Sequence, residues 1–306
     1  MDTPDTMTCP KCGFEQERFD ECVKCGVIIS KYLNLKEDQG GAKESVADVS
    51  PVASGRGTRL KRIVQIALVV NMLLLALSIV MKNRLPGKEA MLKQLRRQPI
   101  QLPTDTGAFT RKVKDVRYLI VPLYSYELYG MIVSYHHSGS WWDMYHHQLW
   151  GDYVNVKDIC VIWGPNILTE VYRQMKFSSD TWTCFASTET QEAWYQFYPT
   201  CLSNNHLLSS DRRLNKEIMR ARKGDQVYLR GYLAEYSHAG GFQRGTSTSR
   251  TDTGNGACET IWLEEFKILR RANVLWNFLY AASKYGIILC LIALISLFVK
   301  QPARVE

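Results

Sequence analysis

A chain of 306 residues is long enough for two or three domains. Its composition, with 46% hydrophobic and 22% charged residues, excludes a generally disordered chain. The formal net charge is +8, from 38 basic and 30 acidic residues, and the basic excess within residues 83–272 is small. A dedicated nucleic-acid surface shows a concentrated basic patch instead, so nucleic acid is not expected as a partner.

The first motif along the chain is a pair of Cys-x-x-Cys sequences in residues 9–26, CPKCGFEQERFDECVKCG. A two-residue gap lets one tight turn present two thiolates to the same tetrahedral ion, and the glycine after each pair lets the backbone fold back beneath the sulfurs. We predict one structural zinc ion, because four protein ligands leave no open coordination position. Two disulfides or a redox pair are the alternative. The predicted ligands are Cys9, Cys12, Cys22 and Cys25.

Residues 1–33 resemble the short zinc ribbons found at the cytosolic N-termini of many bacterial membrane proteins, and the continuation VIISKY at residues 27–32 fits that family. The nine-residue spacer between the pairs is shorter than the 15–20 residues of larger ribbons. The resemblance implies a cytosolic module, for which we expect a protein partner on that side. Phe14, Phe19 and Val23 are its predicted small core.

Two long apolar runs follow a polar stretch. Residues 34–62, rich in Lys, Glu, Asp, Gly and Ser, are predicted to be a flexible linker because they bury too little apolar area to offset the entropy of ordering. Residues 63–82 carry an uncharged run that is, at about 1.5 Å per residue, just long enough to cross a hydrocarbon core of about 30 Å. Residues 274–299 form a second run with Lys284 inside it. We predict two transmembrane helices in a lipid bilayer, with an amphipathic helix as the alternative for the second; residues 300–306 are a tail.

Residues 83–112 are predicted to be a juxtamembrane helix or linker. Met91, Leu92 and Leu95 share one helical face among basic residues. That pattern indicates either a short helix on anionic headgroups or a stalk that extends the membrane helix. Pro99 ends the helix in both cases.

Residues 113–271 are predicted to be a β-rich domain, because segments rich in β-branched and aromatic residues recur there. One helix is predicted over residues 210–223, where Leu214, Ile218 and Ala221 share a face and Gly224 follows as a left-handed end. The predicted strands are residues 116–123, 128–136, 158–164, 181–187, 226–236 and 260–269.

The order of these elements resembles the OB fold, a five-stranded barrel with a helix between its third and fourth strands. Residues 224–233, GDQVYLRGYL, resemble the fourth strand of such domains, because a later glycine allows the strand to bend. The predicted fold class is therefore a multi-domain membrane protein with a small zinc ribbon, two transmembrane helices and a β-rich, OB-like barrel with one helix. The alternative for the domain is another small β-barrel or an α+β sandwich.

The topology rests on the redox state of the cysteines. Two spans place both termini on one side, and zinc thiolates need a reducing compartment, so we expect cytosolic termini and extracytoplasmic residues 83–272 in a bacterial inner membrane. The positive-inside rule points the other way, because more basic residues follow the first span than precede it. We give the zinc argument more weight, since long domains translocate largely regardless of charge. The middle domain can form up to two disulfides from Cys160, Cys184, Cys201 and Cys258, whose pairing stays open.

Two stretches of the domain are candidate binding sites. Residues 134–164 contain two pairs of histidines, and His136 and His146 are the candidate ligands of a metal or haem, or acid–base groups; packing around a loop is the alternative. Residues 239–257 form a glycine-rich loop with Arg244, Arg250 and Asp252, which suits sugars, phosphates or carboxylates, the alternative being a mobile hairpin tip.

These observations lead to two functional hypotheses. The first is a membrane-anchored binding or scaffolding protein, in which the external OB-like domain binds a glycan, a peptide or an anionic ligand. The second is an envelope metal- or haem-binding protein, or a hydrolase, built on the stretch from His136 to His147. No Gly-x-Ser-x-Gly, His-Glu-x-x-His or dinucleotide-binding motif occurs, so no catalytic residue is predicted and an enzyme is not the favoured interpretation.

Overall fold

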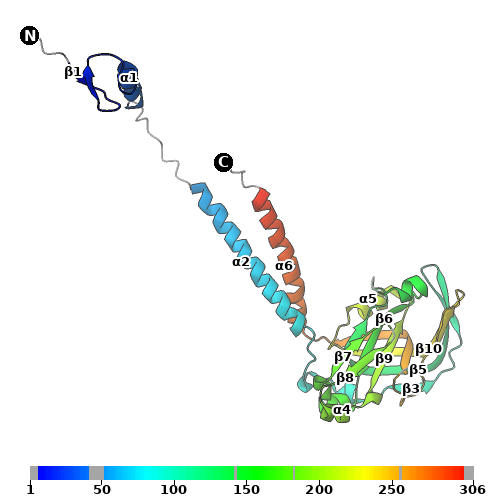
Figure 1. The fold of residues 1–306 in the computed structure, drawn as a ribbon. Helices are drawn as coiled ribbons and strands as arrows, with labels where there is room; N and C mark the ends of the chain where they lie inside the picture. The colour runs from blue at the N-terminus through cyan, green and yellow to red at the C-terminus, as the bar shows by residue number, and fades with distance from the viewer. Residues whose placement is uncertain (1–5, 41–51, 141–142, 182, 255–256, 300–306) are drawn as a thin grey trace, which may run out of the picture. The chain divides into compact units, whose positions relative to one another are not determined.

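The computed structural model describes residues 6–40, 52–140, 143–181, 183–254 and 257–299. The chain divides into two units, residues 1–61 and residues 62–306 (Figure 1). The middle of the predicted linker, residues 41–51, lies outside the described residues, as do the tail at 300–306 and the tryptophans at 141–142.

The first unit is a small module with two short strands and one helix. Its elements are β1 (Thr6–Thr8), β2 (Glu15–Glu17), which pairs with β1, and α1 (Ile29–Gly40). The buried residues among those described in this module are Cys9, Gln16, Cys22 and Ile29. The predicted small core is wrong, because Phe14, Phe19 and Val23 are 37%, 56% and 73% exposed. A module this small has interior room for little more than the sulfur atoms.

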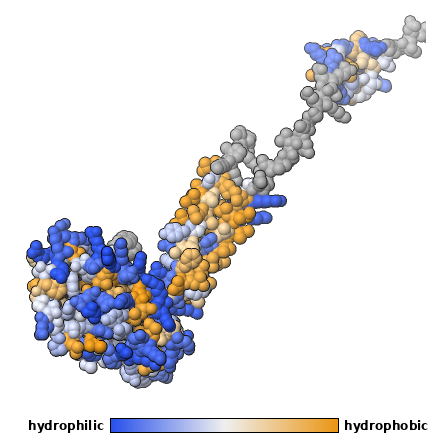
Figure 2. All heavy atoms as spheres, turned by 180° about the vertical axis from the view of Figure 1, so that it is seen from behind, coloured by the Kyte–Doolittle hydropathy of each residue, from blue (hydrophilic) through white to orange (hydrophobic). Residues whose placement is uncertain are grey.

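Two long apolar helices are present, α2 (Val52–Met81) and α6 (Val274–Val299). Both are long and apolar enough to cross a membrane, and Figure 2 shows hydrophobic residues gathered over their surface. The linker predicted for residues 34–62 is shorter than expected. Its first residues belong to α1, which ends at Gly40, and its last residues belong to α2, which begins at Val52.

The two apolar helices pack closely through small and polar residues. A Cβ atom added to Gly286 on α6 would lie 2.3 Å from Oδ1 of Asn71 on α2, so only glycine allows this approach. Ser78 on α2 and Ser283 on α6 are buried. Where the helices meet the β-rich domain, the Asn273 side chain donates hydrogen bonds to the carbonyls of Lys82 and Arg84, at 3.0 and 2.6 Å.

Residues 83–112 are part of the β-rich domain, in contrast to the predicted headgroup helix or stalk. The segment contains the 3-10 turns η1 (Lys88–Ala90) and η2 (Lys93–Arg96) and the strands β3 (Ile100–Pro103) and β4 (Phe109–Val113), both of which pair with β5. Leu95 is fully buried and Met91 nearly so, in a cluster with Met131 and Ile162. The apolar residues thus face the domain core instead of a membrane surface.

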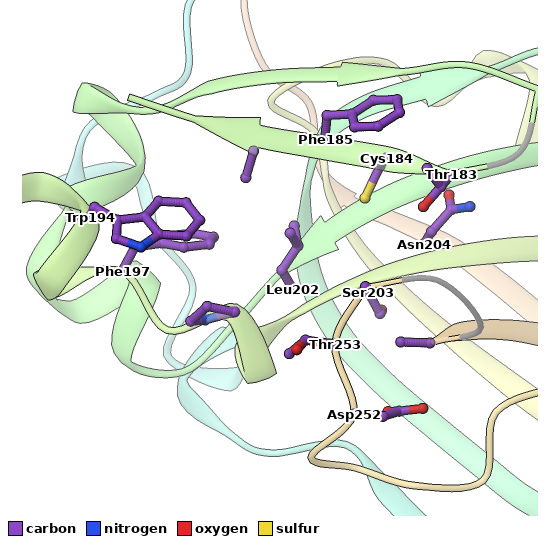
Figure 3. A pocket seen from close by; sticks show the side chains of 14 residues that line it. Thr183, Cys184, Phe185, Trp194, Phe197, Leu202, Ser203, Asn204, Asp252 and Thr253 are labelled. Atoms are coloured by element: carbon purple, nitrogen blue, oxygen red, sulfur yellow. The ribbon is translucent and has the colours of Figure 1, made fainter. Parts of the chain in front are cut away.

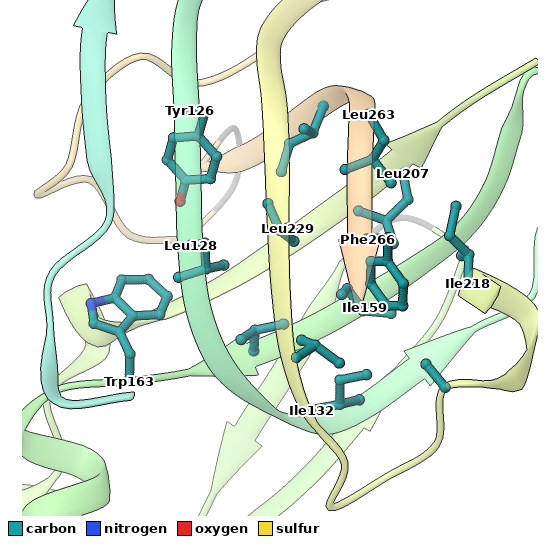
Figure 4. Packing of buried hydrophobic residues seen from close by; sticks show 14 of the residues in the cluster. Tyr126, Leu128, Ile132, Ile159, Trp163, Leu207, Ile218, Leu229, Leu263 and Phe266 are labelled. Carbon is teal, nitrogen blue, oxygen red and sulfur yellow. The ribbon is translucent and has the colours of Figure 1, made fainter. Parts of the chain in front are cut away.

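The main sheet has eight strands, and its five longest are β5 (Val116–His136), β6 (Asn155–Ile162), β9 (Leu202–Leu208), β10 (Gln226–His238) and β12 (Cys258–Arg270). The antiparallel pairs are β5–β6, β6–β9, β10–β12 and β5–β10, and β9 pairs parallel with β12. Each of the five therefore pairs with two of the others. Side chains from one face of these strands pack in a core that includes Ile159, Leu207, Leu229 and Leu263 (Figure 4).

Two of the predicted strands, residues 116–123 and 128–136, are one 21-residue strand. Leu123 is an extra residue opposite the step from Leu233 to Ala234, so a bulge replaces the expected break. Further along, a Cβ atom at Gly130 would lie 2.2 Å from Cγ1 of Val161, and this glycine brings β5 close to β6.

From the sequence, residues 181–187 are expected to form the strand that precedes the helix, but in the structure they have a different place. Within this range, β8 (Cys184–Ser187) pairs with β7 (Lys176–Ser179) in a separate two-stranded sheet. The strand before the helix is β9, whose polar residues Asn204, Asn205 and His206 hid its strand character in the sequence. A disulfide between Cys160 of β6 and Cys184 of β8 joins the small sheet to the main one.

The remaining elements connect the strands. The helix predicted at residues 210–223 forms as α5 (Arg212–Arg220), and the Asp211 side chain accepts hydrogen bonds from the backbone N–H groups of Arg213 and Leu214 at its start. Ile218 and Ala221 join the main core. The others are η3 (Tyr145–Leu149), α3 (Pro165–Thr169), η4 (Val171–Gln174), α4 (Gln191–Gln196), η5 (Pro199–Cys201) and β11 (Gln243–Arg244), which pairs with β10.

Candidate functional site

The four N-terminal cysteines converge on one point. The Sγ atoms of Cys9 and Cys25 are 3.9 Å apart, those of Cys12 and Cys22 are 3.7 Å apart, and all four sulfurs lie within 4.8 Å of one another. At a zinc–sulfur bond length of about 2.3 Å, the edge of a regular tetrahedron measures about 3.8 Å. The four thiols therefore have the spacing that one tetrahedral ion requires.

Two equivalent turns produce this arrangement. In the first, the N–H of Gly13 donates to the carbonyl of Cys9 at 2.9 Å, and in the second the N–H of Gly26 donates to the carbonyl of Cys22 at 2.8 Å. Both glycines have φ near +70°, a conformation that residues with a Cβ rarely adopt. The glycines after each Cys-x-x-Cys pair thus serve the purpose that the sequence predicted.

The second candidate site is a row of polar side chains across four strands of the main sheet. His136 on β5 is opposite Asp158 on β6, Asp158 is opposite His206 on β9, and His206 is opposite Thr260 on β12. These side chains point away from the core that contains Ile159 and Leu207, because neighbouring strand residues face opposite sides. We call them the polar row.

The loop between β5 and β6 is tied to the polar row by one carboxylate. Oδ2 of Asp143 lies 2.7 Å from Nε2 of His136 and 2.7 Å from Nδ1 of His146, and Oδ1 accepts the backbone N–H groups of Tyr145 and His146. Burial raises the pKa of Asp143, but these hydrogen bonds outweigh it, so the net shift is downward. The two histidines predicted as ligands, His136 and His146, are therefore brought together by contacts with the same carboxylate oxygen of Asp143.

The ligand atoms of His136, Asp143 and His146 are close enough to hold a metal ion, but the surrounding hydrogen bonds favour a direct bridge. Nδ2 of Asn155 donates to Oδ1 of Asp158 at 2.9 Å. Because a carboxylate only accepts hydrogen bonds, the amide group of Asn155 must point its nitrogen, and not its oxygen, toward Asp158. The same Nδ2 lies 3.2 Å from Nε2 of His146, so that nitrogen is the acceptor. The proton of His146 is then on Nδ1 and points to Asp143. A metal bound between these two residues would need the lone pair of Nδ1 instead.

The centre of the polar row is a buried ion pair. Nδ1 of His206 lies 2.7 Å from Oδ1 of Asp158, and both side chains are shielded from solvent. Burial lowers the pKa of His206, but the adjacent carboxylate outweighs burial and raises the pKa to about 9. Burial raises the pKa of Asp158, and the charge of His206 outweighs it and lowers the pKa to about 2. Both groups are therefore charged at neutral pH.

The three loop residues predicted as ligands are not together. Arg244 lies close enough to Tyr236 and Asp158 to influence the pKa of each, beside the polar row. Arg250 instead pairs with the buried carboxylate of Glu259, Nη1 to Oε1 at 2.8 Å, and holds a separate structural position.

Asp252 lines a cavity at the start of β9, together with Leu202, Ser203 and Asn204 of that strand. The cavity has a volume of about 420 Å³, and its lining combines the rings of Phe185, Trp194 and Phe197 with the polar groups of Asn204 and Asp252. Figure 3 shows Trp194 and Phe197 on one side, with Asp252 and Asn204 away from them across the cavity. The described residues that line it include no lysine or arginine. We call it the aromatic cavity.

Comparison with known protein families, with curated proteins and with solved structures finds no match to this chain. The sites are therefore defined by geometry alone. Sequence reasoning missed Asp158 and Asn155, which lie on a strand and make no motif. It also missed Trp194 and Phe197, which lie in a connection far from the glycine-rich loop.

We predict that the purified full chain contains one zinc ion per molecule, held by the cysteine tetrad. Cys9→Ser and Cys22→Ser each remove a ligand and should abolish stoichiometric metal in elemental analysis. Cys201→Ser, which changes a buried cysteine outside the tetrad, should keep the zinc. A metal ion that survives Cys9→Ser and disappears in His146→Ala would instead place a metal at Asp143.

We predict a pH-dependent contribution of the Asp158–His206 pair to stability. Because the His206 pKa is raised by folding, the stabilisation is fully present below the unfolded pKa of about 6.5 and is lost as the pH rises through about 9. Asp158→Asn should lower the free energy of unfolding by about 3–5 kcal/mol at about pH 6, and by less at about pH 10. Denaturant unfolding of the full chain in detergent measures this difference.

The control for this experiment is Glu217→Gln, which removes an exposed ion pair with Arg220. It should change stability by less than about 1 kcal/mol at either pH. An Asp158→Asn penalty of equal size at both pH values would contradict a charged pair.

Proposed function

We propose that this chain is a membrane-anchored binding protein, with a zinc ribbon in the cytosol and an OB-like domain outside it that binds a glycan in the aromatic cavity. The observation that carries the ligand assignment is the lining of that cavity, which offers aromatic rings, an amide and a carboxylate without a cation. Pockets of this kind bury an apolar face of the ligand and orient it with a few polar groups.

The strand pairings support the OB-like assignment. With β5, β6, β9, β10 and β12 taken as strands one to five, the third strand pairs parallel with the fifth, the fourth pairs with the first, and α5 lies between the third and the fourth. OB domains bind oligonucleotides and oligosaccharides on the face of strands two and three, beside the loops that follow strands one and four. The aromatic cavity contains residues of the third strand and of the loop after the fourth.

The charge of the cavity separates the two ligand classes. Oligonucleotides are bound largely through basic side chains on their phosphates, and the residues that line the cavity include the acidic Asp252 but no base of that kind. A neutral sugar ring has no phosphate and therefore needs no basic side chain. It can pack on the aromatic rings and form hydrogen bonds with Asn204 and Asp252. We therefore favour a glycan over a nucleic acid.

The sidedness in this proposal is supported by the cysteines. A disulfide between Cys160 and Cys184 is typical of an oxidising compartment, whereas a thiolate tetrad needs a reducing one. In the sequence, α2 lies between the tetrad and the disulfide and α6 follows both, an order that is compatible with two membrane spans.

We predict that the full chain in detergent binds neutral oligosaccharides on an immobilised panel. Trp194→Ala should weaken this binding by about tenfold or more, because the ring contributes about 1–3 kcal/mol of contact energy. Tyr195→Ala is the matched control, since Tyr195 is the next residue of α4, is 75% exposed and does not line the cavity. Equal binding by the two variants, or binding only to a single-stranded oligonucleotide, would contradict the proposal.

A further inference from the structure

A second cavity, of about 430 Å³, lies where α2 and α6 meet the β-rich domain. Its lining includes cations from three separate segments: Lys82 at the end of α2, Arg222 and Lys223 after α5, and Lys284 on α6. Segments far apart along the chain thus contribute like charges to one space. We call it the basic cavity.

Among the described residues, no carboxylate oxygen lies within 4.0 Å of a side-chain nitrogen of the four cations of the basic cavity. None of them appears in an ion pair there, although other surface cations do, such as Lys112 with Asp115 and Arg230 with Glu264. Lys82 and Lys284 instead lie 3.5 and 5.4 Å from the centre of the Tyr280 ring.

One carboxylate is near this group but is already occupied. Asp225 interacts electrostatically with Arg222, yet its Oδ2 accepts the backbone N–H of Arg222 at 3.0 Å and its Oδ1 accepts that of Ala272 at 2.7 Å. Burial also lowers the pKa of Lys223, as expected for a cation held without a counter-ion. The arrangement is electrostatically incomplete, and an anion in the basic cavity would complete it.

The position of the basic cavity indicates the source of that anion. On α6, Lys284 and Tyr285 are followed by an uninterrupted apolar stretch, and Ile288, which also lines the cavity, is 50% exposed. Polar headgroup contacts and an apolar surface are therefore adjacent, at the end of the helix pair that meets the domain. Tyrosine and lysine at such a boundary are typical of the headgroup level of a bilayer.

We propose that the basic cavity binds the phosphate group of an anionic phospholipid whose acyl chains lie along α6. This inference rests on the membrane anchoring proposed above and is independent of the glycan site. The phosphate of the lipid would offset part of the positive charge of the four cations and hold the β-rich domain against the membrane surface. Basic pockets between membrane helices recognise lipid headgroups in this way.

The test uses the full chain in nanodiscs of phosphatidylcholine with a small share of phosphatidylglycerol, followed by counting of the co-purified lipids. The double variant Arg222→Gln/Lys223→Gln should retain about tenfold less phosphatidylglycerol than the unchanged chain. Lys82→Gln is an independent variant that should also lower retention, and it leaves the β-rich domain untouched. The matched control is Arg212→Gln/Arg213→Gln, two exposed cations of α5 that do not line the cavity.

Inorganic phosphate, added as a competitor, distinguishes the two sources of the anion. Retention of phosphatidylglycerol in its presence supports a lipid site, and displacement at low concentration supports a site for free phosphate. Equal lipid retention by the double variant and the control would overturn the proposal. If the chain stays in the membrane fraction in that case, the lipid site fails while the anchoring stands.

Discussion

The cysteine tetrad of the first unit needs thiolates to hold an ion, whereas Cys160 and Cys184 are joined by a disulfide. These two states of sulfur are stable under opposite redox conditions, so one compartment does not suit both. In the proposed topology a membrane separates the tetrad from the disulfide, and α2, the first apolar helix, lies between Cys25 and Cys160 in the sequence. The proposed topology depends on this chemistry more than on the distribution of basic residues.

The polar row explains which part of the β-rich domain is open to a ligand. In OB domains the face of the second and third strands is a binding surface. Here Asp143, from the connection between β5 and β6, hydrogen-bonds to His136 of the polar row, and Asn155 at the start of β6 donates to Asp158. His146 of the same connection hydrogen-bonds to Asp143. The histidines that indicated a metal or haem site from the sequence thus have a structural explanation. The ligand site that we propose is instead the aromatic cavity beside α4.

The sequence predicted features that depend on local pattern. The spacing of the cysteines, the glycines after each pair, the two apolar runs and the helix that begins at Asp211 are all determined by residues close together in the chain. Periodicity also located most strands of the β-rich domain, though β5 was divided in two at residues 124–127, next to the bulge at Leu123.

What the sequence did not predict depends on contacts between distant segments. The strand character of β9 was hidden because Asn204 and His206 are polar yet buried, and their partners Cys160 and Asp158 come from another strand. The basic cavity joins Lys82 with Arg222 and Lys284, which no local motif relates. Trp194 was not predicted as a site residue for the same reason: only the fold places it opposite Asp252.

The most direct measurement of the central claim is the labelling of single introduced cysteines in intact cells with a maleimide that does not cross membranes. Lys216→Cys, on the exposed side of α5, should be labelled in intact cells, whereas Lys31→Cys, on α1, should be labelled only after the membrane is permeabilised. Labelling of both positions only after permeabilisation, or of Lys31→Cys alone in intact cells, would contradict the separation of the thiolate module from the disulfide-containing domain.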